Sequence, residues 1–490
     1  MNAEGIDSVK RLLITIGACG LSAVAFWYGS GLDPIWWCAW IAPLPVFLWC
    51  TRLGAFWAFA FAMAASFIGA LNEWHYIHTL IGLPALVVVA ILAPPSLIFA
   101  LATLLWRWMV LRGAFIRAAV IFPATIVAYY FVQQLLSVHA TFGNPGYSQM
   151  QFLPILQIAS LTGIAGVAFA QFFLPAALAA AAIGKGRVRH RMLTAAGAVA
   201  GIAAICLWGG LRLSESPGQT LEVGLVAVDL DNIPRLRGPE ARLALVTLYA
   251  ERAVDLIERG ARLVILPEKI MRVSDQELAG IEAPIRRAAE KGAVVVFGIE
   301  RWSTDRKFNE ARVYSPVGGR ISTYEKHHML PPFESDLEVG TTRLVIDQPA
   351  TKWGLQICKD MDFPQLSREY GSDRVGMMIV PAWDFDADGW LHGRMAIMRG
   401  VESGFSVARA ANDGRLTLSD NRGRVLADAV TQNSVATTVL ASLPMHHDST
   451  LYARWGDWFS WLSIFMLAAT ALSAVGGRRT GNENQETRNT

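Results

Sequence analysis

Charged residues are scarce in this chain of 490 residues: 17% are charged, whereas 53% are hydrophobic. A soluble domain carries about 25% charged residues, so the composition excludes a wholly soluble protein and places part of the chain in lipid. The net charge is only +3, and no basic stretch is interleaved with aromatic residues. These absences argue against a nucleic-acid-binding protein, and we expect no nucleic-acid partner.

Cysteine is scarce as well, with five residues in the whole chain. The four that lie in apolar runs, where a thiol behaves as a small hydrophobic group, are Cys19, Cys38, Cys50 and Cys206. Cys358 is the only cysteine outside these runs, which excludes a disulfide framework in the more polar segment around it. Taken alone, Cys358 is best interpreted as an inert buried thiol.

Long apolar runs are abundant, and a membrane-spanning helix needs about 20 apolar residues. The candidate spans cover residues 11–29, 34–50, 54–71, 83–106, 114–136, 153–183, 193–213 and 456–476. The sixth run is long enough to tilt or to contain an interfacial turn. The pattern therefore predicts a polytopic α-helical membrane bundle of about eight spans.

Basic residues between the runs predict the orientation of this bundle, because Lys and Arg favour the cytoplasmic side. The basic clusters lie at Lys10 and Arg11, at Arg107, Arg112 and Arg117, at Lys185 to Arg191, and at Arg478 and Arg479. All of them fall on one side, so both termini are predicted to be cytoplasmic. The domains are predicted as an N-terminal bundle of seven spans at 1–213, an extracytoplasmic domain at 214–450, a C-terminal transmembrane helix at 451–477 and a disordered cytoplasmic tail at 478–490.

From Leu221 the pattern changes to that of an α/β domain. Apolar runs of strand length alternate with amphipathic segments, which is typical of a sheet built from crossover units. The predicted strands cover residues 221–228, 262–266, 293–299, 311–314, 343–346, 355–358, 376–380 and 406–410, and the predicted helices cover 241–259 and 281–291. The runs 311–315 and 320–324 flank a turn and predict a hairpin.

Three reactive side chains follow predicted strands of this domain: Glu268, Lys326 and Cys358. In such sheets functional residues gather beyond the carboxyl ends of strands. A carboxylate, an amine and a thiol can supply a base, an oxyanion stabiliser and a nucleophile. Singly, Glu268 is better explained as a helix cap, Lys326 as a solvated charge and Cys358 as a core residue. Their joint occurrence favours a catalytic site.

Two motifs resemble metal sites, but we assign neither as one. His75 and His78 have the spacing of a ligand pair, yet no further ligand pattern accompanies them, so an exposed loop is the simpler interpretation. The stretch Asp384–Gly389 resembles the start of a calcium loop, but the twelfth position is Met395 instead of a glutamate. We predict a solvated acidic loop there, and we expect neither a metal nor a cofactor.

The motifs around the three reactive residues resemble those of the nitrilase (carbon–nitrogen hydrolase) superfamily. They are Leu266–Glu268, Tyr324–Lys326, Pro332–Glu334 and Gly354–Pro364, followed by Arg399, Glu402, Asn412, Gly414, Asp420 and Gly423. About eight spans beside one such domain, with Gly146–Gln149 before the sixth span, are similar to the bacterial apolipoprotein N-acyltransferases. The resemblance implies a nitrilase-like αββα sandwich carried by a bundle in the bacterial cytoplasmic (inner) membrane.

The resemblance also implies a reaction. Glu268 would take the thiol proton, Cys358 would attack a phospholipid ester, and Lys326 with a backbone N–H would stabilise the oxyanion. The thioester on Cys358 would then acylate the α-amine of a diacylglyceryl-cysteine apolipoprotein. Glu334 would orient Lys326. The implied partners are membrane phospholipids as acyl donor and diacylglyceryl lipoproteins as acceptor, and we expect a monomer.

Three stretches differ from the family pattern. The family usually has Tyr-Glu after its cysteine, whereas this chain has Lys359 and Asp360, of which Asp360 retains a carboxylate. The segment Asp229–Pro234 lacks the Gln-Gly and the nearby aromatic residue of the family, and Val380–Asp384 replaces Asn-Asp-Ala-Trp. We expect supporting positions at Lys359, Asp360 and Trp383. Apolar loop residues at Met329, Leu330 and Phe333 are candidates for lining a lipid path.

Two other functions stay open on the sequence. A membrane-anchored carbon–nitrogen hydrolase (amidase) would release its thioester to water, and a non-catalytic nitrilase-like protein would bind a lipid or a partner. A transporter is disfavoured, because the middles of the spans contain few paired charges.

Overall fold

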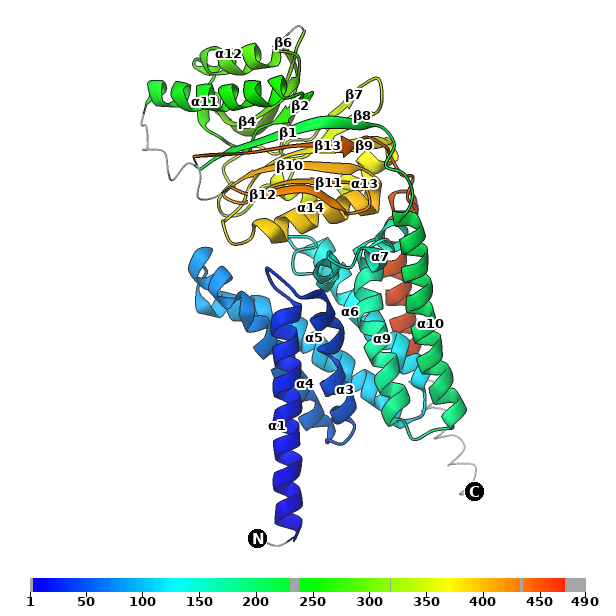
Figure 1. Cartoon of the computed structure of the whole chain (residues 1–490). Helices are drawn as coiled ribbons and strands as arrows, with labels where there is room; N and C mark the ends of the chain where they lie inside the picture. The colour runs from blue at the N-terminus through cyan, green and yellow to red at the C-terminus, as the bar shows by residue number, and fades with distance from the viewer. Residues whose placement is uncertain (1–2, 230–237, 318, 432–434, 472–490) are drawn as a thin grey trace, which may run out of the picture.

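The computed structural model describes residues 3–229, 238–317, 319–431 and 435–471. Figure 1 shows two parts, a helical bundle formed mainly by the N-terminal half and an α/β domain stacked on one end of it. The expectations for residues 230–234 of the first loop and for the tail 478–490 concern residues outside these ranges.

Within the described residues, six helices are long and apolar enough to cross a membrane. They are α1 (Ala3–Gly29), α4 (Ala55–Ala70), α5 (Ala85–Leu111), α6 (Phe115–Leu136), α9 (Ile164–Ile183) and α10 (Val188–Leu213). Their apolar side chains form a core that includes Trp106 and Phe122, each fully buried. Each of these helices lies on one of the predicted runs, so the prediction of a polytopic helical bundle is confirmed.

Two of the eight predicted spans are shorter in the structure. The run 34–50 is divided at Pro43 into α2 (Trp36–Ile41) and α3 (Leu44–Cys50), and the last apolar helix is described over Trp458–Ala471. A count of eight spans therefore stays a prediction.

The run 153–183 is broken near its start. Short helices α7 (Leu153–Leu156) and α8 (Ala159–Thr162) precede Gly163, whose φ of 68° ends the helical path before α9 begins. The run was expected either to tilt or to contain a turn, and the structure has a turn. Gly163 permits it, because a left-handed backbone conformation is tolerated best by glycine. Further short elements at this end of the bundle are η1 (Leu71–Glu73), η2 (His75–Leu80), η3 (Pro145–Gln149) and α15 (Leu451–Trp455).

The α/β domain contains two sheets. In the first, the strand order is β13-β1-β2-β4-β5-β6, with β3 also paired to β4. Its strands are β1 (Thr220–Val228), β2 (Leu263–Ile265), β3 (Arg272–Ser274), β4 (Val294–Trp302), β5 (Lys307–Ser315), β6 (Gly319–Glu325) and β13 (Ala436–Pro444). Strands β1, β2 and β4 are parallel, and β5 and β6 form the predicted hairpin with Ser315 opposite Gly319.

The second sheet has the order β12-β11-β10-β9-β8-β7. Its strands are β7 (Val345–Asp347), β8 (Lys352–Leu355), β9 (Val375–Trp383), β10 (Ser406–Asn412), β11 (Arg415–Ser419) and β12 (Val425–Val430). Strands β8, β9 and β10 run parallel. The predicted strand at 355–358 ends three residues early, and Cys358 begins the short 3-10 helix η4 (Cys358–Asp362).

The two sheets pack face to face, and helices cover both outer faces. A shared core between the sheets joins Leu225 and Ile265 to Leu355 and Ile379. Helices α11 (Pro239–Glu258) and α12 (Leu278–Ala289) cover the first sheet, and α13 (Pro364–Ser372) and α14 (Gly389–Ser403) cover the second. The predicted αββα sandwich is confirmed.

Helix α14 joins the sandwich to the bundle (Figure 1). The buried guanidinium of Arg394 donates to the carbonyl oxygens of Gly31 (3.0 Å) and Leu32 (2.8 Å) in the loop after α1. About two turns further along α14, Oε1 of the buried Glu402 accepts from the backbone N–H of Ile164 (2.7 Å), the first residue of α9. These bonds fix the sandwich on one end of the bundle.

Candidate active site

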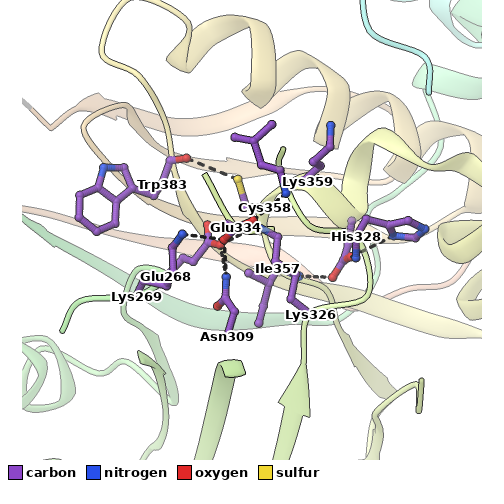
Figure 2. Close-up of polar contacts among 12 residues, drawn as sticks. Glu268, Lys269, Asn309, Lys326, His328, Glu334, Ile357, Cys358, Lys359 and Trp383 are labelled. Atoms are coloured by element: carbon purple, nitrogen blue, oxygen red, sulfur yellow. Dashed lines mark hydrogen bonds and ion pairs between the residues drawn. The ribbon is translucent and has the colours of Figure 1, made fainter. Parts of the chain in front are cut away.

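Glu268, Lys326 and Cys358 come from three separate strands and meet at one place, as the sequence predicted (Figure 2). Glu268 lies three residues after β2, Lys326 follows β6 directly, and Cys358 follows β8. Because β2 and β8 belong to different sheets, the site lies where the ends of both sheets meet. Glu268 and Lys326 are almost fully buried, and Cys358 is partly buried.

The ammonium group of Lys326 lies between two carboxylates. Its Nζ donates to Oε1 of Glu268 (2.8 Å) and to Oε2 of Glu334 (2.7 Å). The amide of Asn309 donates to the same carboxylates, at 2.5 Å and 2.9 Å, and Lys269 donates to Oε1 of Glu334 (2.6 Å). Two carboxylates, two ammonium groups and an amide therefore form one connected, buried network.

The charges of this network determine which groups are ionised. Burial lowers the pKa of Lys326, but the charges of Glu268 and Glu334 outweigh it, so the pKa is raised and the ammonium persists. Burial raises the pKa of Glu334, but Lys326 and Lys269 outweigh it and lower the pKa to about 2. Glu334 is therefore a permanent anion at neutral pH.

The thiol of Cys358 is neutral at rest. Burial and the charge of Glu268 raise its pKa well above the usual value, and Lys326 opposes them only in part. Its Sγ donates to the carbonyl oxygen of Trp383 (3.4 Å). The residue has a φ of 44°, a left-handed conformation that costs about 1–3 kcal/mol in a non-glycine residue and occurs most often at functional sites.

Asp360 holds the turn that carries Cys358 against the segment after Lys326. Its carboxylate is fully buried and accepts from Tyr324 Oη (2.8 Å) and from the backbone N–H groups of His327 (3.1 Å), His328 (2.8 Å) and Ile357 (3.0 Å). The expected supporting position at Asp360 thus joins the two segments on which Lys326 and Cys358 lie.

Lys359 points away from this network, towards the bundle (Figure 2). Its buried Nζ donates to Oδ2 of Asp362 (3.2 Å) and to Nδ1 of His139 (3.1 Å), which lies in the loop after α6. Burial and the charge of Lys359 lower the pKa of His139, which leaves a neutral imidazole to accept this bond. Lys359 is therefore a contact between the sandwich and the bundle.

The stretch Asp384–Gly389 is not the solvated loop that we predicted. Asp384 is buried in a bidentate ion pair with Arg409, and Asp388 is buried against His392 (3.2 Å) and Tyr76 Oη (2.6 Å). The prediction was wrong because Arg409 and Tyr76, which help to bury these carboxylates, are distant from them in the sequence. Among the described residues, no group of three or more His, Cys, Asp and Glu side chains is arranged to hold a metal ion.

A cavity of about 500 Å³ connects the thiol to the bundle. Cys358, Lys359 and Trp383 line it on the side of the sandwich, as do Leu330 and Phe333 of the predicted lipid path. On the side of the bundle, residues of α1, α4, α5, α6 and α9 line it. The cavity gives an apolar group access from among the helices to Cys358.

Comparison with known proteins agrees with both parts of the chain. Residues 22–177 match the apolipoprotein N-acyltransferase N-terminal domain, and residues 225–447 match the carbon–nitrogen hydrolase domain. An apolipoprotein N-acyltransferase of Geobacter metallireducens is 25% identical over 98% of both chains. The chain belongs to the apolipoprotein N-acyltransferase family, within the nitrilase superfamily.

Other members of the family are similar over shorter stretches. The apolipoprotein N-acyltransferases of Rhodopseudomonas palustris and Bradyrhizobium diazoefficiens are 26% and 27% identical, each over 73% of both chains. Among solved structures, an amidase from Nesterenkonia sp. aligns with 49% of this chain and 94% of its own at 18% identity, with a TM-score of 0.41.

Sequence reasoning missed several polar residues around the site of this family member. Lys269 directly follows Glu268, and Asn309 is a buried polar residue in the otherwise buried strand β5. A polar residue in such a strand is itself a signal, because burying an amide without a partner is unfavourable. Arg409 in β10 carries the same signal. No signal in the sequence marked His139, because its partner Lys359 is 220 residues away.

Proposed function

We propose that this protein transfers an acyl chain from a membrane phospholipid to the N-terminal amine of diacylglyceryl-cysteine apolipoproteins. The observation that carries the proposal is the cavity that runs from the thiol of Cys358 into the helical bundle. A soluble amide would need no such space among membrane helices, whereas an acyl chain does. Family membership supports the same assignment.

In the first half-reaction, Glu268 takes the thiol proton and Sγ of Cys358 attacks the carbonyl carbon of the phospholipid ester. The negative charge that develops on the carbonyl oxygen is stabilised by the ammonium of Lys326 and by a backbone N–H at the start of η4. The carbon–oxygen bond then breaks, Glu268 returns the proton to the leaving oxygen, and a lysophospholipid departs. A thioester remains on Cys358.

In the second half-reaction, the α-amine of the apolipoprotein attacks the thioester carbon. Glu268 takes a proton from the amine, the carbon–sulfur bond breaks, and the proton passes to Sγ. Lys326 stabilises the second oxyanion as it did the first. The products are the N-acylated lipoprotein and the resting thiol, so Glu268 acts twice and no water is consumed.

Four further residues have supporting roles in this proposal. Glu334 holds the ammonium of Lys326 in place, since their ion pair is buried and 2.7 Å long. Asp360 joins the turn of Cys358 to the segment of Lys326, and Lys359 ties that turn to the bundle through His139. The carbonyl of Trp383 orients the thiol before the proton leaves.

We further propose that the sandwich lies outside the bacterial cytoplasmic membrane and that both termini are cytoplasmic, with eight spans in all. Lys10 lies in the N-terminal part of α1, Arg117 in the first turn of α6 and Arg189 in the first turn of α10. Figure 1 shows the N-terminal end of α1 and the connection between α9 and α10 at the end of the bundle away from the sandwich. Positive residues favour the cytoplasmic side. The proposed domains are the N-terminal bundle at 1–213, the extracytoplasmic domain at 214–450, the C-terminal transmembrane helix at 451–477 and the cytoplasmic tail at 478–490. A monomer suffices, because one chain supplies both the three residues and the cavity.

This topology is testable with single cysteines at exposed positions. In spheroplasts, a membrane-impermeant maleimide should label Ser216→Cys, just before the first strand of the sandwich, but not Arg189→Cys, in the first turn of α10. If only Arg189→Cys were labelled, the orientation of the protein in the membrane would be the opposite of the one proposed.

The function is tested by mass spectrometry of the Cys358 peptide after incubation of the purified protein with phospholipid. We expect a hydroxylamine-labile acyl adduct that is absent in Cys358→Ala and formed at least about 100-fold more slowly in Glu268→Ala, because general-base catalysis contributes on that order. Cys206→Ala is the matched control, and it should retain the adduct.

Addition of a diacylglyceryl-cysteine peptide should then convert the adduct into an N-acyl peptide. Release of free fatty acid without N-acyl peptide would instead identify a hydrolase. No adduct with any phospholipid would refute the proposed reaction.

A further inference from the structure

A cluster of three phenylalanine rings lines the cavity within the bundle: Phe26 of α1, Phe99 of α5 and Phe172 of α9. On each of these helices, the phenylalanine is the lining residue that lies farthest from the sandwich along the helix. The rings of Phe26 and Phe99 meet edge to face with centroids 5.1 Å apart. Fully buried Phe122 packs behind them, 5.5 Å from Phe99 and 5.9 Å from Phe172. Aromatic side chains packed edge to face or tilted against one another therefore form the wall of the cavity farthest from the sandwich.

Behind this cluster the bundle is solidly packed. Phe47 contacts Phe122 edge to face at 4.7 Å and stacks on Trp106 at 4.6 Å, and all three side chains are fully buried. Close packing of this kind leaves no room for a longer ligand unless the rings move.

Two polar side chains near the cluster form hydrogen bonds within the protein. Ser96 Oγ donates to the carbonyl of Leu92 (3.3 Å), and Gln171 Oε1 accepts from Ser148 Oγ (3.4 Å). Most of the other bundle residues that line the cavity are apolar. The closed end therefore suits a hydrocarbon chain.

We propose that the phenylalanine cluster of Phe26, Phe99 and Phe172 is an end stop that sets the length of the acyl chain the enzyme accepts. This inference rests on the proposed acyltransfer, with the ester at Cys358 and the tail directed into the bundle. Phe172 lies eight residues into α9, a depth of about 12 Å along the helix axis. The distance from the Cys358 thiol to these rings determines the longest acyl chain that fits in the cavity.

Discrimination between acyl chains of different length must come from how well the chain fits the cavity, and not from the hydrophobic effect. A lipid tail in the bilayer is already in surroundings as apolar as this cavity, so moving it gains little from the hydrophobic effect. A chain that is too long must displace buried rings, which is unfavourable. A chain that is too short leaves the rings without contacts. We therefore expect the binding affinity to fall sharply once the acyl chain exceeds a particular length.

The test compares three substitutions in the bundle. Phe99→Leu shortens the end stop, whereas Ser66→Leu adds volume at another residue that lines the cavity. Phe47→Leu is the matched control, because it removes a ring of the same kind from the packed core behind the cluster. Phe172→Leu replaces Phe99→Leu if that variant fails to fold.

Binding is measured first, in the Cys358→Ala background, by displacement of a fluorescent phospholipid. The competitors are phosphatidylglycerols that differ only in acyl-chain length, in steps of two carbons. Beyond the cut-off we expect affinity to fall at least about fivefold per step. Phe99→Leu should move the cut-off to longer chains and Ser66→Leu to shorter ones, whereas Phe47→Leu should leave it in place.

The same lipids are then offered to proteins that retain Cys358, and the chain found in the thioester is identified by mass spectrometry. If thioester is absent but the binding cut-off shifts as expected, the acyltransferase proposal fails and the end stop stands. If thioester forms and no variant changes the chain-length distribution, the end stop is refuted. Absence of any cut-off in binding would refute it as well.

Discussion

Replacing Glu334 with Gln isolates the contribution of one buried carboxylate to stability and chemistry. The side chain is 1% exposed and forms ion pairs with Lys326 (2.7 Å) and Lys269 (2.6 Å). The substitution keeps the shape and removes the charge. Lys326 then keeps a single carboxylate partner, Glu268, at 2.8 Å.

The magnitude follows from the pKa of Glu334, which is lowered from 4.5 to about 2. A shift of this size corresponds to about 3 kcal/mol of folding stability, since each pKa unit is about 1.4 kcal/mol. Because the folded-state pKa is depressed, this stability is fully present above about pH 4.5 and is lost as the pH falls towards 2.

Glu334→Gln should therefore be less stable than the parent by about 3 kcal/mol at pH 7, and the difference should shrink below pH 4.5. Urea unfolding of detergent-solubilised protein at several pH values measures it. Glu338→Gln, at an exposed carboxylate on the same segment, is the control and should change stability little. A difference that stays constant with pH would show that the charge of Glu334 is not its source.

The same variant should also slow thioester formation about 100-fold at pH 7, comparable to losing one oxyanion donor. Without Glu334, Lys326 keeps only Glu268 as a carboxylate partner and is drawn towards it, away from the developing oxyanion. Rapid-quench mass spectrometry of the Cys358 peptide measures the rate. An unchanged rate would remove Glu334 from the mechanism.

Three other outcomes follow from the structure. Iodoacetamide should alkylate Cys358 slowly at pH 7 because burial and the charge of Glu268 raise the pKa of the thiol, and the rate should still be rising at pH 9; a rate that levels off below pH 9 in mass-spectrometric kinetics of the Cys358 peptide would contradict this. Asp360→Asn should lower the unfolding free energy by about 2–4 kcal/mol, since several buried hydrogen bonds depend on that carboxylate, and urea melts would count against this network if stability were unchanged. Arg409→Met should cost about 3–5 kcal/mol by leaving Asp384 as an unpaired buried charge, and the double variant with Asp384→Asn should recover part of the loss in the same assay.

Much of the fold was predictable because local patterns determine it. The apolar runs coincide with the six long helices, and the strand runs coincide with β1, β2, β4, β5, β9 and β10. Helix α14 was not predicted, because it is buried along most of its length and so lacks a polar face. Strands β11, β12 and β13 were missed as well.

The candidate site was predictable only in its centre. Glu268, Lys326 and Cys358 each follow a strand, and strand ends of neighbouring sheets can meet. Asn309 and Lys269 complete the charge network from positions that no motif marked. The acidic stretch at Asp384 was misjudged as solvated, because its partner Arg409 comes from a neighbouring strand.

By itself, the amino-acid sequence determined that part of the chain lies in lipid, that an α/β domain follows, and that three reactive residues stand at strand ends. Hydropathy and periodicity decide these features, because each depends on residues close together along the chain. Only the tertiary structure decided which groups are ionised, that Lys359 contacts His139, and that a cavity runs from Cys358 to Phe99. Those properties arise from burial and from contacts between residues far apart in the sequence, and no local pattern encodes them.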